Sequence, residues 1–582
     1  MRKHLMVVVW IILLPILTLG QTTVKVKSDL PPQEGNLNKA VQEAITAGTL
    51  SNTIFELEAY GYYVLTGTIS VPAGMTLRIT APDPGTTQTT APPQIVWSAT
   101  GGVNTNFNFE VFGNISLKNV WLRYANTTGA QVGSSLQIQD DPLATAQHGT
   151  FENVIFDYAP CPPNASGAVG ITTKRFKGVF KNCYFKNCID HHLRYYGRAL
   201  SFPFNTEGWH TLSVLFENCT FANIGYVYMQ EGGQYSDNVR FNHCTFLNVV
   251  MFPLQSGWWY KAAVTNSIFV NCFMFGLNPS QLGTGDPNGA TMRIDSVKNF
   301  GFTVPFTEAD RRILFANNSY FIDPWLVDWM ANNPYSQKLR RERRDDEIPI
   351  PQPMLSPATL VFFEGKDQAG KKLFPYMNKT NIHENADPGF VLPPYAEADV
   401  KDFLRRKWDD NSQHNWAWKT NNDFIGLWPL EESLAYSNQT LKTAGMGGFP
   451  LGDLRWWPAQ FTQWKAQAQA EYDKITDMME KGISSVQDIS GNEIPTDFVL
   501  SQNYPNPFNP TTKIEYSIPN AGYVSLKIFN TLGQEVSTLF EGFQNAGKYV
   551  ADFDGSNLAS GVYLYKLQCN GISISKKLVL MK

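Results

Sequence analysis

The sequence predicts a mostly β protein, in which stacked parallel strands are followed by a tryptophan-rich flank and a small Ig-like β-sandwich. Three observations carry this prediction. A short motif recurs through the middle of the chain, seven of the fifteen tryptophans lie within 400–464, and residues 494–582 alternate short apolar runs with Pro, Gly and Asn. With 582 residues, a charged fraction of 17%, 44 Gly and 35 Pro, the chain is expected to hold several turn-rich domains.

The N-terminus is typical of a secretory signal peptide, predicted over residues 1–20. A polar start precedes an apolar run from Leu5 to Leu19, and Gly20 and Gln21 offer a cleavage point. The run is shorter than the ~20 residues that a membrane-spanning helix needs, and an uncleaved anchor is the alternative. The mature chain is therefore expected outside the cytoplasm, without a transmembrane segment. Its net charge of −4 favours no nucleic-acid partner.

A six-residue repeat defines the central domain, which is predicted over 21–395 and includes a short cap helix at 36–47. The third positions of the copies are Asn119, Asn153, Asn182, Asn218, His243, Asn266 and Asn318. Because they lie 23 to 52 residues apart, we expect coils of short strands stacked at ~4.8 Å through parallel hydrogen bonds, with outer loops in the longer intervals. A second polar column, expected to form a structural ladder, contains Asn187, Asn223, Asn248, Asn271 and Asp323.

The cysteines of this domain are expected to serve packing. Cys183, Cys219 and Cys244 occupy one column of the stack, each following a reference position. Side chains that point in parallel directions are poorly placed for a disulfide, and cysteine suits a buried apolar position. We therefore predict buried free thiols in this column.

These features resemble the pectate-lyase-like right-handed parallel β-helix. The resemblance covers about residues 34–395, including the N-terminal cap helix and the segment NADPGF at 385–390. Proteins with this fold include lyases, glycoside hydrolases, esterases and adhesins. The resemblance therefore implies an architecture and leaves the activity open.

The next region, 396–483, is predicted to be a tryptophan-rich flank that ends in a helix at 465–481. Its tryptophans are Trp408, Trp416, Trp418, Trp428, Trp456, Trp457 and Trp464. Such aromatic residues either stack on sugars or cover the open side of a sheet, and we expect the second role. Residues 484–493 are predicted to be a linker.

The last region, 494–582, carries the most specific motifs of the chain. They are NYPNPFNP at 503–510, IFNTLGQEV around Gly533, LASGVYLYKL at 558–567 and KKLVLMK at 576–582. These segments closely resemble the C-terminal sorting domain (type A) of type IX secretion cargo. The resemblance implies a small β-sandwich that binds the type IX machinery and takes the chain to the outer cell surface, where the domain is removed or replaced by an anchor.

A polar groove on the outside of the stack is the candidate site. His192 and Tyr228 lie ten residues after their reference positions, and a second column lies twelve residues after them. Amide, cationic and aromatic groups in such a stripe suit an oligosaccharide. The residues expected to bind it are Gln230, Gln255, Asn278, Trp258 and Trp259.

Two reactions would suit this groove. Eliminative cleavage of a uronan needs a base, a cation and a proton donor, for which His192, Arg194 and Tyr228 are the candidates. Hydrolysis needs two carboxylates, and Glu207 with Glu231 or Asp190 would supply them. The sequence indicates no metal ligands and no cofactor, and no acidic cluster points to calcium.

The function predicted first is that of a secreted, surface-displayed protein that binds polysaccharide or has an adhesin-like, structural role. The alternative is a polysaccharide lyase or glycoside hydrolase acting on an acidic polysaccharide. A self-assembling surface component is a third reading, but the cap helix and the tryptophan-rich flank argue against open ends.

Overall fold

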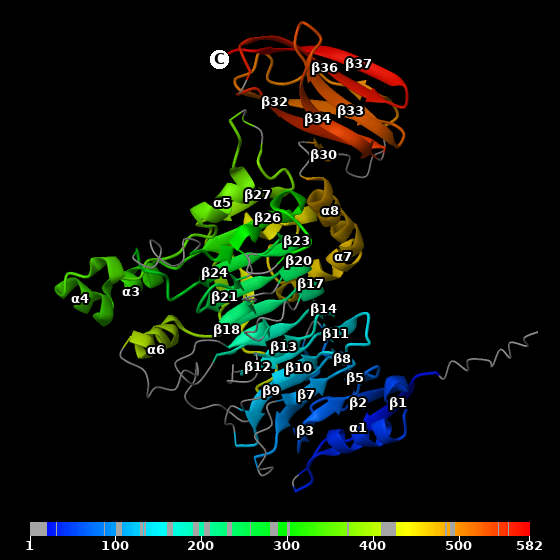
Figure 1. The fold of residues 1–582 in the computed structure, drawn as a ribbon, viewed down its shortest axis with the longest axis vertical. Coiled ribbons are helices and arrows are strands. Elements are labelled where there is room, and N and C mark those ends of the chain that lie inside the picture. The colour runs from blue at the N-terminus through cyan, green and yellow to red at the C-terminus, as the bar shows by residue number, and fades with distance from the viewer. Residues whose placement is uncertain are drawn as a thin grey trace, which may run out of the picture. The chain divides into compact units, whose positions relative to one another are not determined.

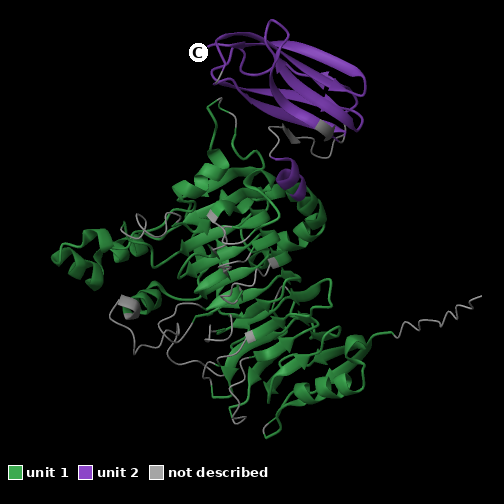
Figure 2. Ribbon diagram, viewed as in Figure 1, with its two compact units in different colours: residues 1–475 green, residues 476–582 purple. Residues whose placement is uncertain are grey.

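The computed structural model describes residues 20–582 except 31, 86–87, 100–106, 129–131, 133–134, 160–166, 190–196, 203–209, 230–234, 256–257, 280–288, 300–302, 369, 371, 409–425, 483–485, 489–494, 545 and 557. The chain divides into two compact units, 1–475 and 476–582 (Figure 2). The predicted signal peptide lies outside the described residues except for Gly20. Within the described parts of the chain, every helix is too short or too polar to span a bilayer. The domain boundaries at 395, 483 and 493 stay predictions.

The first unit is built from three parallel faces that run through successive coils (Figure 1). Two faces form a 19-stranded sheet and the third is an eight-stranded sheet. Every strand pair between coils is parallel, for example β14 with β17 and β15 with β18. This arrangement confirms the predicted parallel β-helix.

The first face consists of β1 (Thr22–Val26), β2 (Thr53–Leu57), β5 (Thr76–Thr80), β8 (Asn114–Lys118), β11 (Gln147–Glu152), β14 (Phe176–Lys181), β17 (His210–Glu217), β20 (Tyr235–Asn242), β23 (Trp259–Thr265), β26 (Arg312–Phe321) and β27 (Met377–Glu384). The second consists of β3 (Tyr62–Leu65), β6 (Gln94–Trp97), β9 (Trp121–Asn126), β12 (Ile155–Asp157), β15 (Tyr184–Lys186), β18 (Thr220–Ile224), β21 (Thr245–Val249), β24 (Ile268–Cys272) and the end of β26. The third consists of β4 (Ile69–Val71), β7 (Phe107–Val111), β10 (Ser135–Gln139), β13 (Val169–Thr172), β16 (Arg198–Ser201), β19 (Tyr226–Met229), β22 (Leu254–Gln255) and β25 (Met292–Arg293).

From β8 onward, the corner between the first two faces depends on a left-handed residue in each coil. The reference residues from Asn119 to Asn266 have φ between 51° and 60°, a region in which asparagine is tolerated better than most residues. In the last coil this residue is Asn317 (φ 54°) and not Asn318, because Ala316 pairs with Thr265 and Ser319 pairs with Ile268. The predicted register was therefore wrong by one residue at this position.

The second polar column is a hydrogen-bonded ladder, as predicted. Asn248 donates to Asn223 over 3.0 Å, and Asn271 donates to Asn248 over 3.1 Å. Asp323 ends the ladder by accepting from the Asn271 side chain at 2.7 Å. The ladder satisfies polar groups that the stacking of coils buries.

The interior of the solenoid is a stack of aromatic rings. Phe180, Phe216 and Phe241 follow one another with centroids 4.5 and 4.8 Å apart. Beside them lie Cys183, Cys219 and Cys244, all fully buried and all free thiols, as predicted. The N-terminal end is covered by α1 (Asn36–Thr46), which buries Leu37, Val41 and Ala44.

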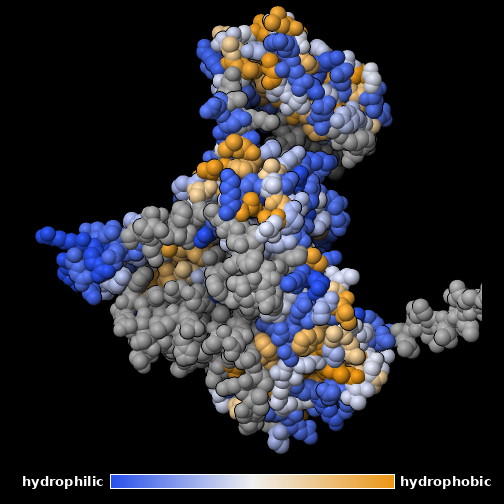
Figure 3. Space-filling model, in the orientation of Figure 1, coloured by the Kyte–Doolittle hydropathy of each residue, from blue (hydrophilic) through white to orange (hydrophobic). Residues whose placement is uncertain are grey.

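Helices and one short antiparallel strand pair surround this core. They are α3 (Pro324–Asn332), α4 (Pro334–Arg341), α5 (Pro357–Glu364), α6 (Glu397–Trp408), α7 (Pro458–Lys465), α8 (Ala468–Lys481), and the antiparallel pair β28 (Phe390–Leu392) and β29 (Ser433–Tyr436). The pair α3 and α4 projects from this core (Figure 1), and α4, with the sequence PYSQKLRR, is strongly hydrophilic (Figure 3).

The flank, used here for the described residues 426–475, covers the outer side of the second face. Trp121, Tyr184 and Leu247 point outward from this face and pack with Leu434 and Trp456 of the flank. The tryptophans within the described flank therefore cover a sheet, as expected. Trp416, Trp418 and the Trp408 side chain lie outside the described residues.

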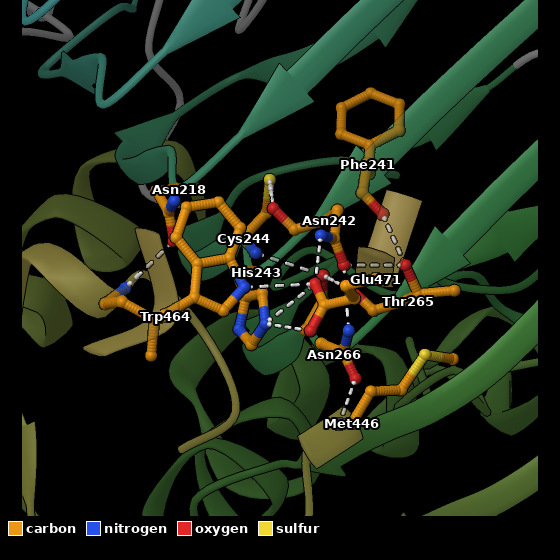
Figure 4. Close-up of polar contacts among 12 residues, drawn as sticks. Asn218, Phe241, Asn242, His243, Cys244, Thr265, Asn266, Met446, Trp464 and Glu471 are labelled. Atoms are coloured by element: carbon orange, nitrogen blue, oxygen red, sulfur yellow. Dashed lines mark hydrogen bonds and ion pairs between the residues drawn. The ribbon is translucent and has the colours of Figure 1, made fainter. Parts of the chain in front are cut away.

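A buried polar cluster around Glu471 fastens the end of the flank to the solenoid (Figure 4). Nε2 of His243 lies 3.3 Å from Oε1 of Glu471, which also accepts from Asn242 at 2.7 Å and from the Trp464 indole at 3.2 Å. Burial alone would raise the pKa of Glu471, but His243 and the two neutral donors outweigh it and hold that pKa below its ordinary value.

The second unit is a sandwich of two four-stranded antiparallel sheets, which confirms the predicted Ig-like β-sandwich. One sheet contains β30 (Val486–Asp488), β31 (Val499–Leu500), β32 (Thr511–Ile518) and β35 (Gly547–Asp554). The other contains β33 (Gly522–Phe529), β34 (Glu535–Gln544), β36 (Gly561–Cys569) and β37 (Ile572–Leu580). Ile514, Leu526 and Tyr565 are fully buried between the two sheets.

Glu471→Gln is expected to lower the free energy of unfolding by about 2 kcal/mol at pH 7, because it removes a buried charged acceptor. A lowered pKa adds stability above the unfolded value near 4.5, and this stability is lost as the pH falls through the folded value. The difference in melting temperature between wild type and variant should therefore shrink on acidification below about pH 4.5. Glu43→Gln on the exposed side of α1 is the matched control and should change little at any pH. A difference that is constant from pH 7 to 3 would contradict this account.

Candidate functional site

Much of the groove predicted from the sequence lies outside the described residues. This applies to His192, Arg194, Gln230 and Glu231, and to the alternative carboxylates Asp190 and Glu207. Gln255 is described only as the last residue of β22. Asn278 and Trp258 are half-buried, and the Trp258 indole donates to the Ser296 carbonyl at 3.3 Å.

Tyr228 and Trp259 do not face the outside of the solenoid. Both side chains are fully buried, their rings meet edge to face at 6.0 Å, and the Tyr228 hydroxyl lies 2.7 Å from the Ser236 hydroxyl. Side chains alternate between the two sides of a strand, and the register of β19 and β23 turns these two inward. Burial also raises the pKa of Tyr228, which opposes a role in proton transfer. The outward position expected for the two residues was therefore wrong.

A cavity of about 360 Å³ lies on the outer side of the second face, where β9, β12 and β15 end. Segments 392–395 and 426–432 form its other walls. Its lining includes Trp121, Arg123, Asp157, Tyr158, Lys186, Asn187, Tyr395, Leu427, Glu431 and Glu432. Its size falls at the lower end of the ~300–1,000 Å³ range of small-molecule sites.

Three successive coils supply a charged row to this cavity. Arg123, Asp157 and Lys186 occupy equivalent positions, since Asp157 pairs in register with both of the others. In the next coil the position is Ala222, which ends the row. Each charged residue lies four positions after the reference asparagine, so the sequence contained the signal.

Asp157 is the acid of this row and is almost fully buried. Its carboxylate lies 3.3 Å from Arg123 Nε and accepts from the Trp121 indole at 3.3 Å and from Asn187 at 3.0 Å. Burial raises the pKa of Asp157 although Arg123 and Lys186 oppose the shift. The site therefore favours a protonated carboxyl more than water does.

Glu432 faces the row from the flank. Its Oε1 lies 2.5 Å from Lys186 Nζ and accepts from the Tyr184 hydroxyl at 2.9 Å. Burial raises the pKa of Glu432, but Lys186 and the hydrogen bonds outweigh this effect, so that the pKa lies below its ordinary value. The pKa values of the two buried acids of the cavity are thus shifted in opposite directions.

Aromatic rings, and a pair of hydrogen bonds between the Gln94 side chain and the Gly426 backbone, complete the walls. The Arg123 guanidinium lies 5.9 Å from the Trp121 ring centre and 5.3 Å from that of Tyr158. The Gln94 amide donates to the Gly426 carbonyl and accepts from the Gly426 N–H, both at 2.9 Å. A Cβ on residue 426 would lie 2.1 Å from the Trp121 ring, so only glycine allows this close approach.

The described residues contain no group of three or more His, Cys, Asp and Glu side chains arranged to hold a metal ion. The cavity instead offers hydrogen-bond acceptors, charged donors and aromatic surface within one small volume. This combination suits binding of a polar organic ligand, and the pair of oppositely shifted carboxyl groups suits proton transfer.

The comparisons with known proteins concern the second unit. Residues 502–581 match the family described as "Secretion system C-terminal sorting domain". The protein is therefore exported through the type IX route to the cell surface or beyond, and its sorting domain interacts with the type IX machinery. Comparison of the whole chain with curated proteins and with solved structures finds no match.

Lys186→Met is expected to lower the free energy of unfolding by about 3 kcal/mol, because it leaves the Glu432 charge buried without its cation. The double variant Lys186→Met/Glu432→Leu should regain most of this loss, since it removes both charges. Urea unfolding measures both effects. The control is Lys118→Met, which breaks the exposed Lys118–Glu152 pair and should cost less than about 1 kcal/mol. Equal losses for the two single variants would contradict a buried role for the pair.

Proposed function

We propose that this protein is a surface-displayed polysaccharide-binding protein with an adhesin-like role. One observation carries the proposal: the cavity that combines the charged row with the Trp121 and Tyr158 rings on the outside of the solenoid. The sorting domain, which takes the chain to the outer surface, gives this cavity access to extracellular polymers.

The chemistry of the cavity supports a saccharide ligand. Sugar hydroxyl groups both donate and accept hydrogen bonds, and here they meet the acceptors Asp157 and Glu432 next to the donors Arg123 and Lys186. The Trp121 and Tyr158 side chains, 2% and 7% exposed, line the same cavity and add apolar surface beside these polar groups. A rigid β-sheet holds the row in place, which limits the entropy lost on binding.

The binding test uses the purified protein and a panel of insoluble neutral and acidic polysaccharides. We expect a fraction of the protein to sediment with at least one polymer and to be released by an excess of the soluble form of that polymer. The control is a protein of similar charge without a solenoid domain. A folded protein that sediments with none of the polymers would refute the proposed function.

A second function, glycoside hydrolysis, is favoured by the opposite pKa shifts of the two carboxyl groups. Asp157, whose pKa is raised, would protonate the glycosidic oxygen, and Glu432, whose pKa is lowered, would act as the ionised partner. These residues would replace the carboxylates predicted from the sequence at Glu207, Glu231 and Asp190.

The hydrolysis test measures the release of reducing ends from the same panel. If the protein is a hydrolase, Asp157→Asn should lower the rate by about 10²-fold or more, because the general acid is lost. Glu152→Gln, which removes an exposed carboxylate of the same solenoid, should leave the rate unchanged. Retention of a polymer without any release of reducing ends would leave binding as the function and rule out hydrolysis.

A further inference from the structure

The charge balance of the cavity restricts the kind of sugar that it suits. Among the described residues that line it, two cations, Arg123 and Lys186, face three carboxylates, of which Asp157 and Glu432 are buried and Glu431 is exposed. Each cation is already close to a carboxylate, at 3.3 Å for Arg123 with Asp157 and 2.5 Å for Lys186 with Glu432. An acidic sugar would have to displace these carboxylates while it faced their repulsion.

An uncharged sugar neither displaces these carboxylates nor is repelled by them. A hydroxyl group can donate to a carboxylate and accept from the neighbouring cation at the same time, which leaves the ion pair in place. The row repeats this pairing at two points, through Arg123 with Asp157 and through Lys186 with Glu432. Two such points fix the orientation of a ring that carries several hydroxyl groups.

Hydrogen-bond donors around Asp157 and Glu432 fix the positions of these two carboxylates before any ligand binds. Asn187 donates to Asp157 and in turn accepts from the Tyr395 hydroxyl at 3.0 Å, while the Tyr184 hydroxyl donates to Glu432. These contacts join the solenoid to segments 392–395 and 426–432, which both line the cavity. The exposed side chains of Leu392 and Leu427 border it.

We infer that this cavity is a subsite for an uncharged sugar unit, whose hydroxyl groups bridge the Arg123–Asp157 and Lys186–Glu432 pairs. The inference rests on the proposed function, since it names the class of sugar that the same cavity takes. It differs from the sequence-based alternative, which expected an acidic polysaccharide. The small volume of about 360 Å³ suits one or two sugar rings.

The test is affinity electrophoresis of the purified protein in native gels that contain a soluble neutral glucan, a galactomannan, polygalacturonate or glycol chitosan. We expect retardation by at least one neutral polymer and none by the two charged ones. Leu427→Trp, which places a larger side chain at the border of the cavity, and Asp157→Asn, which breaks one bridge, should each weaken the retardation at least tenfold. Leu143→Trp is the matched control, because Leu143 is 93% exposed and outside the cavity, and it should migrate as the wild type does.

Each other outcome overturns a distinct part of the argument. Retardation only by polygalacturonate or by glycol chitosan would overturn the uncharged sugar while leaving polysaccharide binding intact. Retardation by a neutral polymer that persists in Leu427→Trp would place the site elsewhere and overturn the inference for this cavity. No retardation by any polymer, with melting temperatures equal to that of the wild type, would overturn the proposed function as well.

Discussion

The left-handed turn at the reference position of each coil is the constraint on which the rest of the solenoid depends. It places the following residue inside and the next one outside, so that Cys219 is buried in the core while Thr220 meets the flank. The same turn sets the residues four positions later in one outward row. Stacked phenylalanine rings, free thiols and the charged row of the cavity therefore all follow from one backbone conformation that asparagine accepts and most residues do not.

The sequence was sufficient to predict the fold because its repeat marks this turn directly. The solenoid, its cap helix, the asparagine ladder, the buried thiols and the C-terminal sandwich could all be derived from local patterns. The last coil was misplaced by one residue because Asn317 and Asn318 are adjacent, and only the pairing of Ser319 with Ile268 decides between them. A pattern of side chains cannot make that choice without the neighbouring coil.

The candidate site was harder to predict for two physical reasons. Counting ten or twelve residues past a reference position crosses a loop whose length differs between coils, which is how Tyr228 was assigned to the outside although its strand turns it inward. The charged row lies only four positions past the reference and crosses no loop. The row forms a cavity only together with Glu432, however. Glu432 lies 246 residues after Lys186, and only the fold brings the two side chains together.

The flank has a consequence for how the solenoid comes apart. A stack of coils that touch only their neighbours can open from either end, one coil at a time. Here a single stretch of chain bonds to Gln94 through Gly426, to Tyr184 through Glu432, to Thr220 through Asp453 and to Asn266 through Met446. The flank therefore cross-links several coils along one side of the solenoid. The coils that contain Gln94, Tyr184, Thr220 and Asn266 are tied to one another through the flank, and we expect this part of the stack to unfold as one cooperative body.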